Sequence, residues 1–69
     1  MVEQININFG TKVRELRTKL GISQEELAER CGLHRNYIGM IERAEKNVTL
    51  SCAERIAKAL TITIKGLLD

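Results

Sequence analysis

The chain lacks proline and tryptophan, and its only aromatic residues are Phe9 and Tyr37. Strands are enriched in aromatic residues, so this shortage argues against a β-sandwich. The core must instead be built from aliphatic residues, which recur at the three- and four-residue spacings of a helix face. With 69 residues there is room for one small domain. We therefore predict an all-α fold, a compact bundle of five helices that forms a single domain over residues 1–69.

Cysteine and histidine are also scarce, with only Cys31, Cys52 and His34 present. Both cysteines fall at apolar positions of predicted helices, as is typical of small buried thiols in a reducing compartment. Their number and spacing fit neither a disulfide framework nor a zinc motif. No nucleophile accompanies His34 in a recognisable catalytic arrangement. We predict no enzymatic activity, no metal site and no cofactor.

No apolar run approaches the roughly 18 residues that cross a membrane, and the N-terminus lacks the basic-then-apolar pattern of a secretion signal. These absences predict a cytoplasmic protein without a membrane partner. The formal net charge of +2 is too small to prove nucleic-acid binding by itself. Any such surface must be recognised from local patterns.

Residues 23–43 predict two short helices joined by a tight turn. Ser23 precedes an apolar-periodic run and Glu26 follows three residues later, which is the capping-box pattern of a helix start. Gly32 stands where a chain leaving a helix commonly needs positive φ. After the turn, helical spacing of apolar residues resumes at Tyr37, Ile38 and Ile41.

Ala28, Gly32 and Ile38 carry a family resemblance. A small residue, a glycine four residues later and a β-branched residue six residues after that have the spacing of the helix-turn-helix of DNA-binding proteins. The chain resembles the Cro/repressor-like family. The resemblance implies that the second helix of the motif, about residues 34–43, lies in the major groove of duplex DNA.

The start of that second helix carries side chains suited to reading bases. Arginine pairs with guanine and asparagine with adenine through two hydrogen bonds, so Arg35 and Asn36 are the leading base readers, with His34 beside them. Gly39 costs about 1 kcal/mol relative to alanine inside a helix. Its missing side chain either lets the helix approach DNA closely or relieves crowding against another helix.

Other residues are predicted to hold the sugar–phosphate backbone rather than read sequence. The free N–H groups at the start of the first motif helix suit a phosphate, and the resemblance implies that Gln24 clamps the backbone there. Tyr37 either donates its hydroxyl to a phosphate or supports the motif from behind. Arg43 either reaches a phosphate or pairs with a nearby glutamate. The resemblance also places the loop after the reading helix along the backbone, and the full set is Gln24, Tyr37, Arg43, Lys46, Asn47 and Thr49.

The flanking segments complete the predicted fold. Residues 1–8 form an extended arm or a frayed terminus, and Asn8 caps a first helix. The core stripe of that helix is Phe9, Val13, Leu16 and Leu20. A fourth helix starts at Thr49 or Ser51, and the pattern does not choose between these caps. Its predicted buried face is Leu50, Ala53, Ile56, Ala57 and Leu60.

Residues 61–69 include a short fifth helix capped by Thr63 and more apolar side chains than one small core needs. We predict that part of this patch is a homodimer interface formed by Ile62, Ile64, Leu67 and Leu68. A two-fold dimer presents two reading helices roughly 34 Å apart and predicts a pseudo-palindromic operator. The alternative is that all four side chains close the monomer core.

The run HRNYIGMIERAEKNVTL is similar to a stretch in the controller proteins of restriction–modification systems. This resemblance covers the chain from about Phe9 onward and implies regulation of its own gene and the endonuclease gene, with activation at low dose and repression at high dose. Activation requires RNA polymerase, for which an acidic surface at Glu25, Glu26 and Glu29 is a candidate. The alternatives are a phage-type repressor or an antitoxin-type regulator with a protein partner.

The chain departs from the usual controller pattern at three groove-facing positions. It has His34, Asn36 and Gly39 where the relatives often carry aspartate, threonine and serine. The resemblance therefore implies the role of the protein but not its operator sequence.

Overall fold

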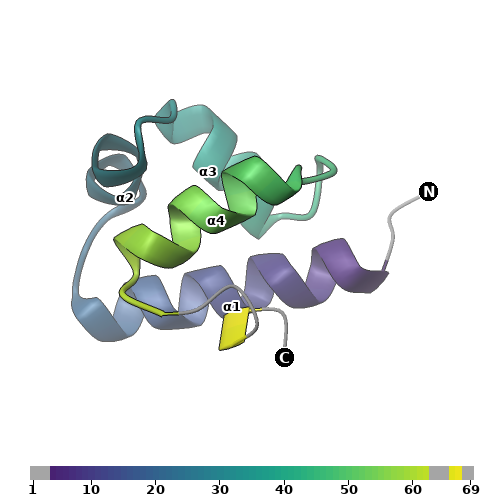
Figure 1. The fold of residues 1–69 in the computed structure, drawn as a ribbon, viewed down its shortest axis with the longest axis horizontal. Coiled ribbons are helices and arrows are strands. Elements are labelled where there is room, and N and C mark those ends of the chain that lie inside the picture. The colour runs from purple at the N-terminus through teal and green to yellow at the C-terminus, as the bar shows by residue number, and fades with distance from the viewer. Residues whose placement is uncertain (1–3, 63–65, 68–69) are drawn as a thin grey trace.

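The computed structural model describes residues 4–62 and 66–67. Four helices are present in these residues: α1 (Gln4–Leu20), α2 (Gln24–Cys31), α3 (Arg35–Glu42) and α4 (Leu50–Ala59). The long helix α1 runs along one side, and α2, α3 and α4 gather over it (Figure 1). No strand occurs in the described residues, which confirms the all-α prediction.

The predicted number of five helices is wrong for the part of the chain that the structure describes. Thr63, the expected cap of the fifth helix, lies outside the described residues. Of the stretch that was to follow it, only residues 66–67 are described as helical, which is less than one turn.

α1 begins earlier than its sequence pattern indicates. It starts at Gln4, so an arm or frayed end over residues 4–8 is wrong, and Asn8 lies inside the helix instead of capping it. Asn6 joins the core-facing stripe of the helix, and its amide is hydrogen-bonded to Asn47 in the loop between α3 and α4. This contact with a distant part of the chain stabilises the first turns of α1, and it could not be predicted from the residues near Asn6.

The C-terminal end of α1 also differs from the prediction. Leu20 was expected in the core stripe but is 47% exposed. Gly21 turns the chain at a φ of 71°, and Ile22 beyond it is buried in the core. The inward position at this end is therefore filled by the residue after the turn rather than by the last residue of the helix.

α2 begins and ends as its local sequence predicts, and α3 lies within the predicted range of about residues 34–43. The Ser23 hydroxyl oxygen accepts a hydrogen bond from the backbone N–H of Glu26 at 3.0 Å. Gly32 has a φ of 71°, in the left-handed region, and the N–H of Leu33 donates back to Ala28 O at 2.9 Å. The N-cap of α3 is His34, whose Nδ1 accepts from the N–H of Asn36 at 3.1 Å.

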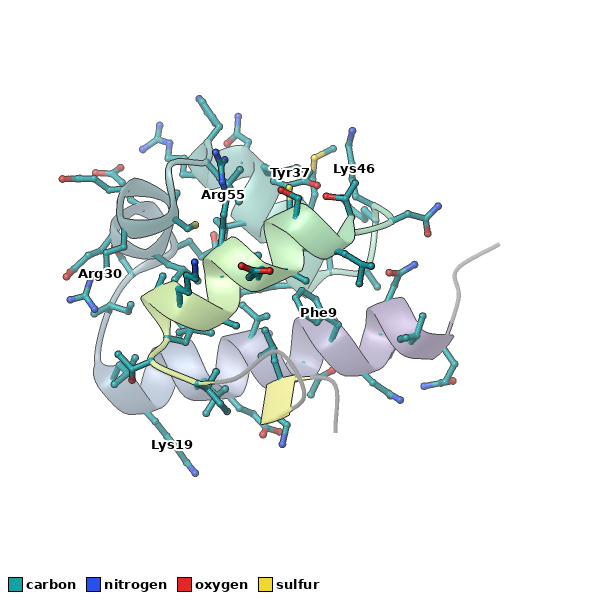
Figure 2. All side chains as sticks on the ribbon, viewed as in Figure 1. Phe9, Lys19, Arg30, Tyr37, Lys46 and Arg55 are labelled. Carbon is teal, nitrogen blue, oxygen red and sulfur yellow. The ribbon has the colours of Figure 1, made fainter. Side chains whose placement is uncertain are left out.

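The core is aliphatic, and Phe9 is the one aromatic side chain buried in it among the described residues. Phe9 on α1 is 3% exposed and belongs to this core, while Lys19 at the far end of α1 points into solvent (Figure 2). Ala28 is 3% exposed and Ile38 is fully buried, as their places in the motif require. The largest fully buried side chains are Leu27, Ile38, Ile41, Ile56, Leu67 and Val13.

At Gly10, α1 lies close against the backbone of α3. A Cβ atom at this position would clash with the carbonyl oxygen of Ile41 and would lie 3.0 Å from that of Glu42. Only glycine permits this spacing because backbone atoms of α3 occupy the place of a side chain. Sequence reasoning did not single out this residue.

α4 is capped by Thr49, whose hydroxyl oxygen accepts from the N–H of Cys52 at 3.1 Å, so Thr49 rather than Ser51 is the N-cap. Leu50, predicted to be buried, is 77% exposed because the first residue of the helix projects beyond the core. The other four residues of the predicted face are buried: Ala53, Ile56, Ala57 and Leu60.

Two of the four residues assigned to a dimer interface are described. Leu67 is 1% exposed and belongs to the core of the monomer, and Ile62 is partly buried against that core. Ile64 and Leu68 lie outside the described residues. Leu67 thus follows the alternative in which the apolar segment closes the monomer. None of the described helices has the length and apolarity needed to span a bilayer.

Candidate nucleic-acid interface

The start of α2 and the exposed side of α3 enclose a shallow concave surface that is open to solvent. We call it the α2–α3 surface. Five of the predicted DNA-contacting residues line it together: Gln24, Arg35, Asn36, Gly39 and Arg43. The other lining residues are Arg17, Ser23, Glu25 and Met40. Base-reading and backbone-holding candidates therefore share one face, as a groove-binding surface requires.

Arg35 is paired across this surface with Glu25. Its Nη1 lies 2.7 Å from Glu25 Oε2, and the two side chains are 64% and 67% exposed. Such an exposed pair contributes little to stability, so a guanine edge can replace the carboxylate at small cost. Glu25, one of the three acidic residues predicted to contact RNA polymerase, therefore lies within the α2–α3 surface.

Gly39 stands beside side chains and not beside the backbone of another helix. A Cβ there would lie 3.0 Å from Arg43 Nη1 and 3.6 Å from Gln24 Oε1. The Arg43 contact is tight but involves the end of a flexible side chain that can move aside, and the Gln24 contact is an ordinary van der Waals contact. Crowding against a neighbouring helix is therefore limited to the Gln24 side chain, and Gly39 itself is buried next to the ends of the Gln24 and Arg43 side chains.

Gln24 is held by a buried ion pair that sequence reasoning missed. Arg17 Nε lies 2.7 Å from Glu42 Oε2, and their side chains are 15% and 4% exposed. Glu42 Oε1 also accepts from Gln24 Nε2 at 2.9 Å, and Arg17 Nη1 donates to Ile22 O at 2.9 Å. The network fixes Gln24 at the start of α2. A sequence signal existed, because Arg17 and Glu42 each stand four residues after a buried apolar residue.

Arg43, at the end of α3, forms the glutamate pair that was one of its two predicted alternatives. Its Nε and Nη2 donate to the carboxylate of Glu45 at 3.0 and 3.2 Å. This hydrogen bonding raises the pKa of Arg43 and lowers the pKa of Glu45. The pair is exposed, so it leaves the guanidinium within reach of a phosphate.

Tyr37 in α3 and Lys46 in the loop that follows α3 lie near the start of α4 (Figure 2). Lys46 Nζ is 5.9 Å from the centroid of the Tyr37 ring, within the range of a cation–π contact. The Tyr37 hydroxyl donates to Cys52 Sγ at 3.8 Å. Burial, with the Cys52 thiol as a smaller cause, raises the pKa of Tyr37. Tyr37 thus packs behind the motif, as one of its two predicted roles requires.

The remaining candidates are His34, Asn47 and Thr49, and all three are exposed. His34 and Thr49 are the caps of α3 and α4, and Asn47 lies in the loop between these helices. The structure therefore divides the predicted DNA-contacting residues into two groups. One lines the α2–α3 surface and the other is arranged around the α3–α4 loop, while His34, the N-cap of α3, belongs to neither.

A family model described as helix-turn-helix matches residues 13–67. The chain belongs to this helix-turn-helix family. Its motif consists of α2, the turn at Gly32 and α3, and the resemblance inferred from Ala28, Gly32 and Ile38 is confirmed.

Relatives within the helix-turn-helix family include control proteins. The chain is 50% identical over 70 residues to control protein C.BamHI of Bacillus amyloliquefaciens, covering 100% of this chain and 86% of that protein. It is 54% identical over 56 residues to control protein C.SmaI of Serratia marcescens, covering 81% and 67%. The crystal structure of the restriction-modification controller protein C.AhdI from Aeromonas hydrophila superposes with a TM-score of 0.87 at 45% identity, covering 90% of this chain and 94% of that one.

Proposed function

We propose that this chain is a controller protein of a restriction–modification system, a DNA-binding transcription regulator rather than an enzyme. The observation that carries the proposal is the α2–α3 surface, where the polar start of α3 stands exposed beside the N-terminus of α2. The controller relatives named above support the same role. The protein would regulate its own gene and that of the endonuclease.

In this proposal α3 reads the major groove. Arg35 and Asn36 contact base edges, His34 lies beside them, and Gly39 lets the helix approach the bases. The exposed Glu25–Arg35 pair supports this role because it holds the Arg35 guanidinium at the α2–α3 surface, where it is open to solvent. A guanine in each half-site is the expected partner of Arg35.

Contacts to the DNA backbone frame the reading helix on both sides. Gln24, fixed by Glu42, and Arg43 hold phosphates at the α2–α3 surface, together with the free N–H groups at the start of α2. The α3–α4 loop holds the backbone on the other side through Lys46, Asn47 and Thr49, while Tyr37 packs behind the motif and contacts Lys46. These contacts fix orientation and register and carry no sequence information.

We further propose that the protein forms a homodimer through the segment 61–69 and that this dimer binds a pseudo-palindromic operator. Ile62 remains partly exposed, and Ile64 and Leu68 complete the proposed patch. Leu67 anchors this segment to the monomer, because its side chain is buried in the core. RNA polymerase is the proposed partner in activation, and of the acidic candidates Glu26 and Glu29 are not engaged with the reading helix.

The test is selection of bound sequences from a random duplex pool at physiological salt, with the protein at a concentration where it is dimeric. We expect a short pseudo-palindrome whose half-sites lie about one helical turn, roughly 10 base pairs, apart. Recovery of no preferred sequence would reject the groove-reading role. Co-purification with the product of a neighbouring gene would then favour the antitoxin-type alternative.

A further inference from the structure

The first turn of α1 reverses the usual placement of polar and apolar residues. Asn6 is 8% exposed, whereas its neighbours Ile5 and Ile7 are 59% and 41% exposed. Asn6 precedes Phe9 by three residues and Gly10 by four, so it stands on the core-facing stripe of the helix. Burying an amide there costs free energy unless the amide is hydrogen-bonded. The position therefore calls for a specific partner.

That partner is Asn47, which is 41 positions away in the α3–α4 loop. Asn6 Nδ2 donates to Asn47 Oδ1 at 2.6 Å. A side-chain amide has one oxygen that accepts and one amino group with two donors. Because the oxygen of Asn47 is turned inward toward Asn6, its amino group is turned toward solvent. Asn47 is itself exposed, so this donor is accessible.

We propose that Asn6 is a positioning residue for DNA binding. By holding Asn47 Oδ1, it directs the Asn47 amino group outward to donate to a phosphate oxygen of the DNA backbone. The inference rests on the backbone contact proposed above for Asn47. Asn6 precedes the residues matched by the family model, which begin at residue 13, so the helix-turn-helix motif itself does not include it.

A purely structural tether is the competing explanation, and the two differ in how stability and affinity are linked. Replacing Asn6 by leucine places an apolar side chain on the core-facing stripe and frees Asn47. We expect Asn6→Leu to fold with unchanged or higher stability, while its affinity for a duplex operator falls roughly three- to tenfold. If the Asn6–Asn47 bond only tethered the loop to α1, a variant with unchanged stability would also keep its affinity for DNA.

The decisive measurement is a double-mutant cycle on the full chain. Affinity for the duplex recovered by selection is measured by fluorescence anisotropy for the wild type, Asn6→Leu, Asn47→Ala and the double variant. We expect Asn47→Ala to weaken binding about tenfold and Asn6→Leu to have no further effect in that background. The dependence of affinity on salt should stay unchanged in these variants, because a neutral amide releases no counterion.

A second variant reverses the amide. An ionised aspartate can only accept a hydrogen bond, so Asn6→Asp draws the Asn47 amino group inward and turns its oxygen toward the phosphate. Binding should weaken more than in the matched control Asn8→Asp. That control adds the same charge at an exposed position of α1 and keeps the acceptor that Gln4 uses. Asn6→Asp also tests the inference if Asn6→Leu does not fold.

The outcomes separate the inference from the function on which it rests. If Asn47→Ala binds as the wild type does, the backbone contact of Asn47 is refuted, and the inference with it. If Asn47→Ala weakens binding but Asn6→Leu does not, the backbone contact stands and the role of Asn6 is refuted. The same conclusion follows if Asn6→Leu weakens binding by the same factor in the wild type and in the Asn47→Ala background. Equal effects of Asn6→Asp and Asn8→Asp would also refute it.

Discussion

Glu42→Ala should be among the most destabilising single substitutions at a polar position in this protein. It leaves Arg17 Nε and Nη2 without their acceptor in a site where the Arg17 side chain is 15% exposed, and it removes the acceptor of Gln24 Nε2. Removing one partner of a buried ion pair costs about 3–5 kcal/mol. Arg17 keeps its bond to Ile22 O, so we expect the lower part of this range.

The expected loss is large for a chain of this size. Domains are stabilised by roughly 0.05–0.15 kcal/mol per residue, which for 69 residues is about 3–10 kcal/mol. Urea unfolding followed by circular dichroism measures the change as a shift of the midpoint at constant slope. The matched control is Glu54→Ala, which breaks an exposed pair with Lys58 and should cost no more than about 0.5 kcal/mol.

A double replacement separates the ion pair from simple loss of packing. Arg17→Met combined with Glu42→Leu removes both charges and keeps the volume, so its free energy of unfolding should return to near that of the wild type. If Glu42→Ala lowers the free energy of unfolding no more than Glu54→Ala does, the Arg17–Glu42 pair does not stabilise the fold. The inference that this pair fixes Gln24 is then refuted.

Three other predictions concern the binding face and its support. Arg35→Ala should cost about 1–3 kcal/mol of binding free energy and relax the base preference at one base pair per half-site. Lys46→Ala should instead weaken binding to all sequences alike and lower the slope of log affinity against log salt by about one. Identical behaviour of the two variants in binding titrations would refute the division of roles. Gly39→Ala should stabilise α3 by up to about 1 kcal/mol while lowering DNA affinity, because its Cβ displaces only the movable end of Arg43 but adds a side chain at the α2–α3 surface. Gly10→Ala should instead destabilise the fold by at least about 1–3 kcal/mol, since the backbone of α3 cannot move aside, and a wild-type melting temperature would contradict this contact.

The helix-turn-helix could be predicted because short-range interactions determine its boundaries. Ser23 caps α2 through a residue three positions away, and Gly32 ends it by its own backbone conformation. The spacing of Ala28 and Ile38 adds only the contact between the two adjacent helices. All of this information lies within one stretch of sequence.

The supporting structure could not be predicted because its contacts join distant positions. Arg17 and Glu42 are 25 residues apart, and Asn6 and Asn47 are 41 apart. As single residues they are typical of exposed helix faces or loops, and only the packing of α1 beneath α3 makes them partners. Leu20 and Leu50 were misassigned for a related reason, since a periodic stripe does not show where the neighbouring helices end.

The close contact at Gly10 bears on how such a protein changes its target during evolution. It involves backbone atoms of Ile41 and Glu42 at the C-terminal end of α3, whereas Arg35, Asn36 and Gly39 line the open α2–α3 surface. The part of α3 that anchors the helix and the part proposed to read DNA therefore share no side chain. New operator preferences can arise by substitution on the open side without loss of folding stability, so a regulator and its site can diverge together in small steps.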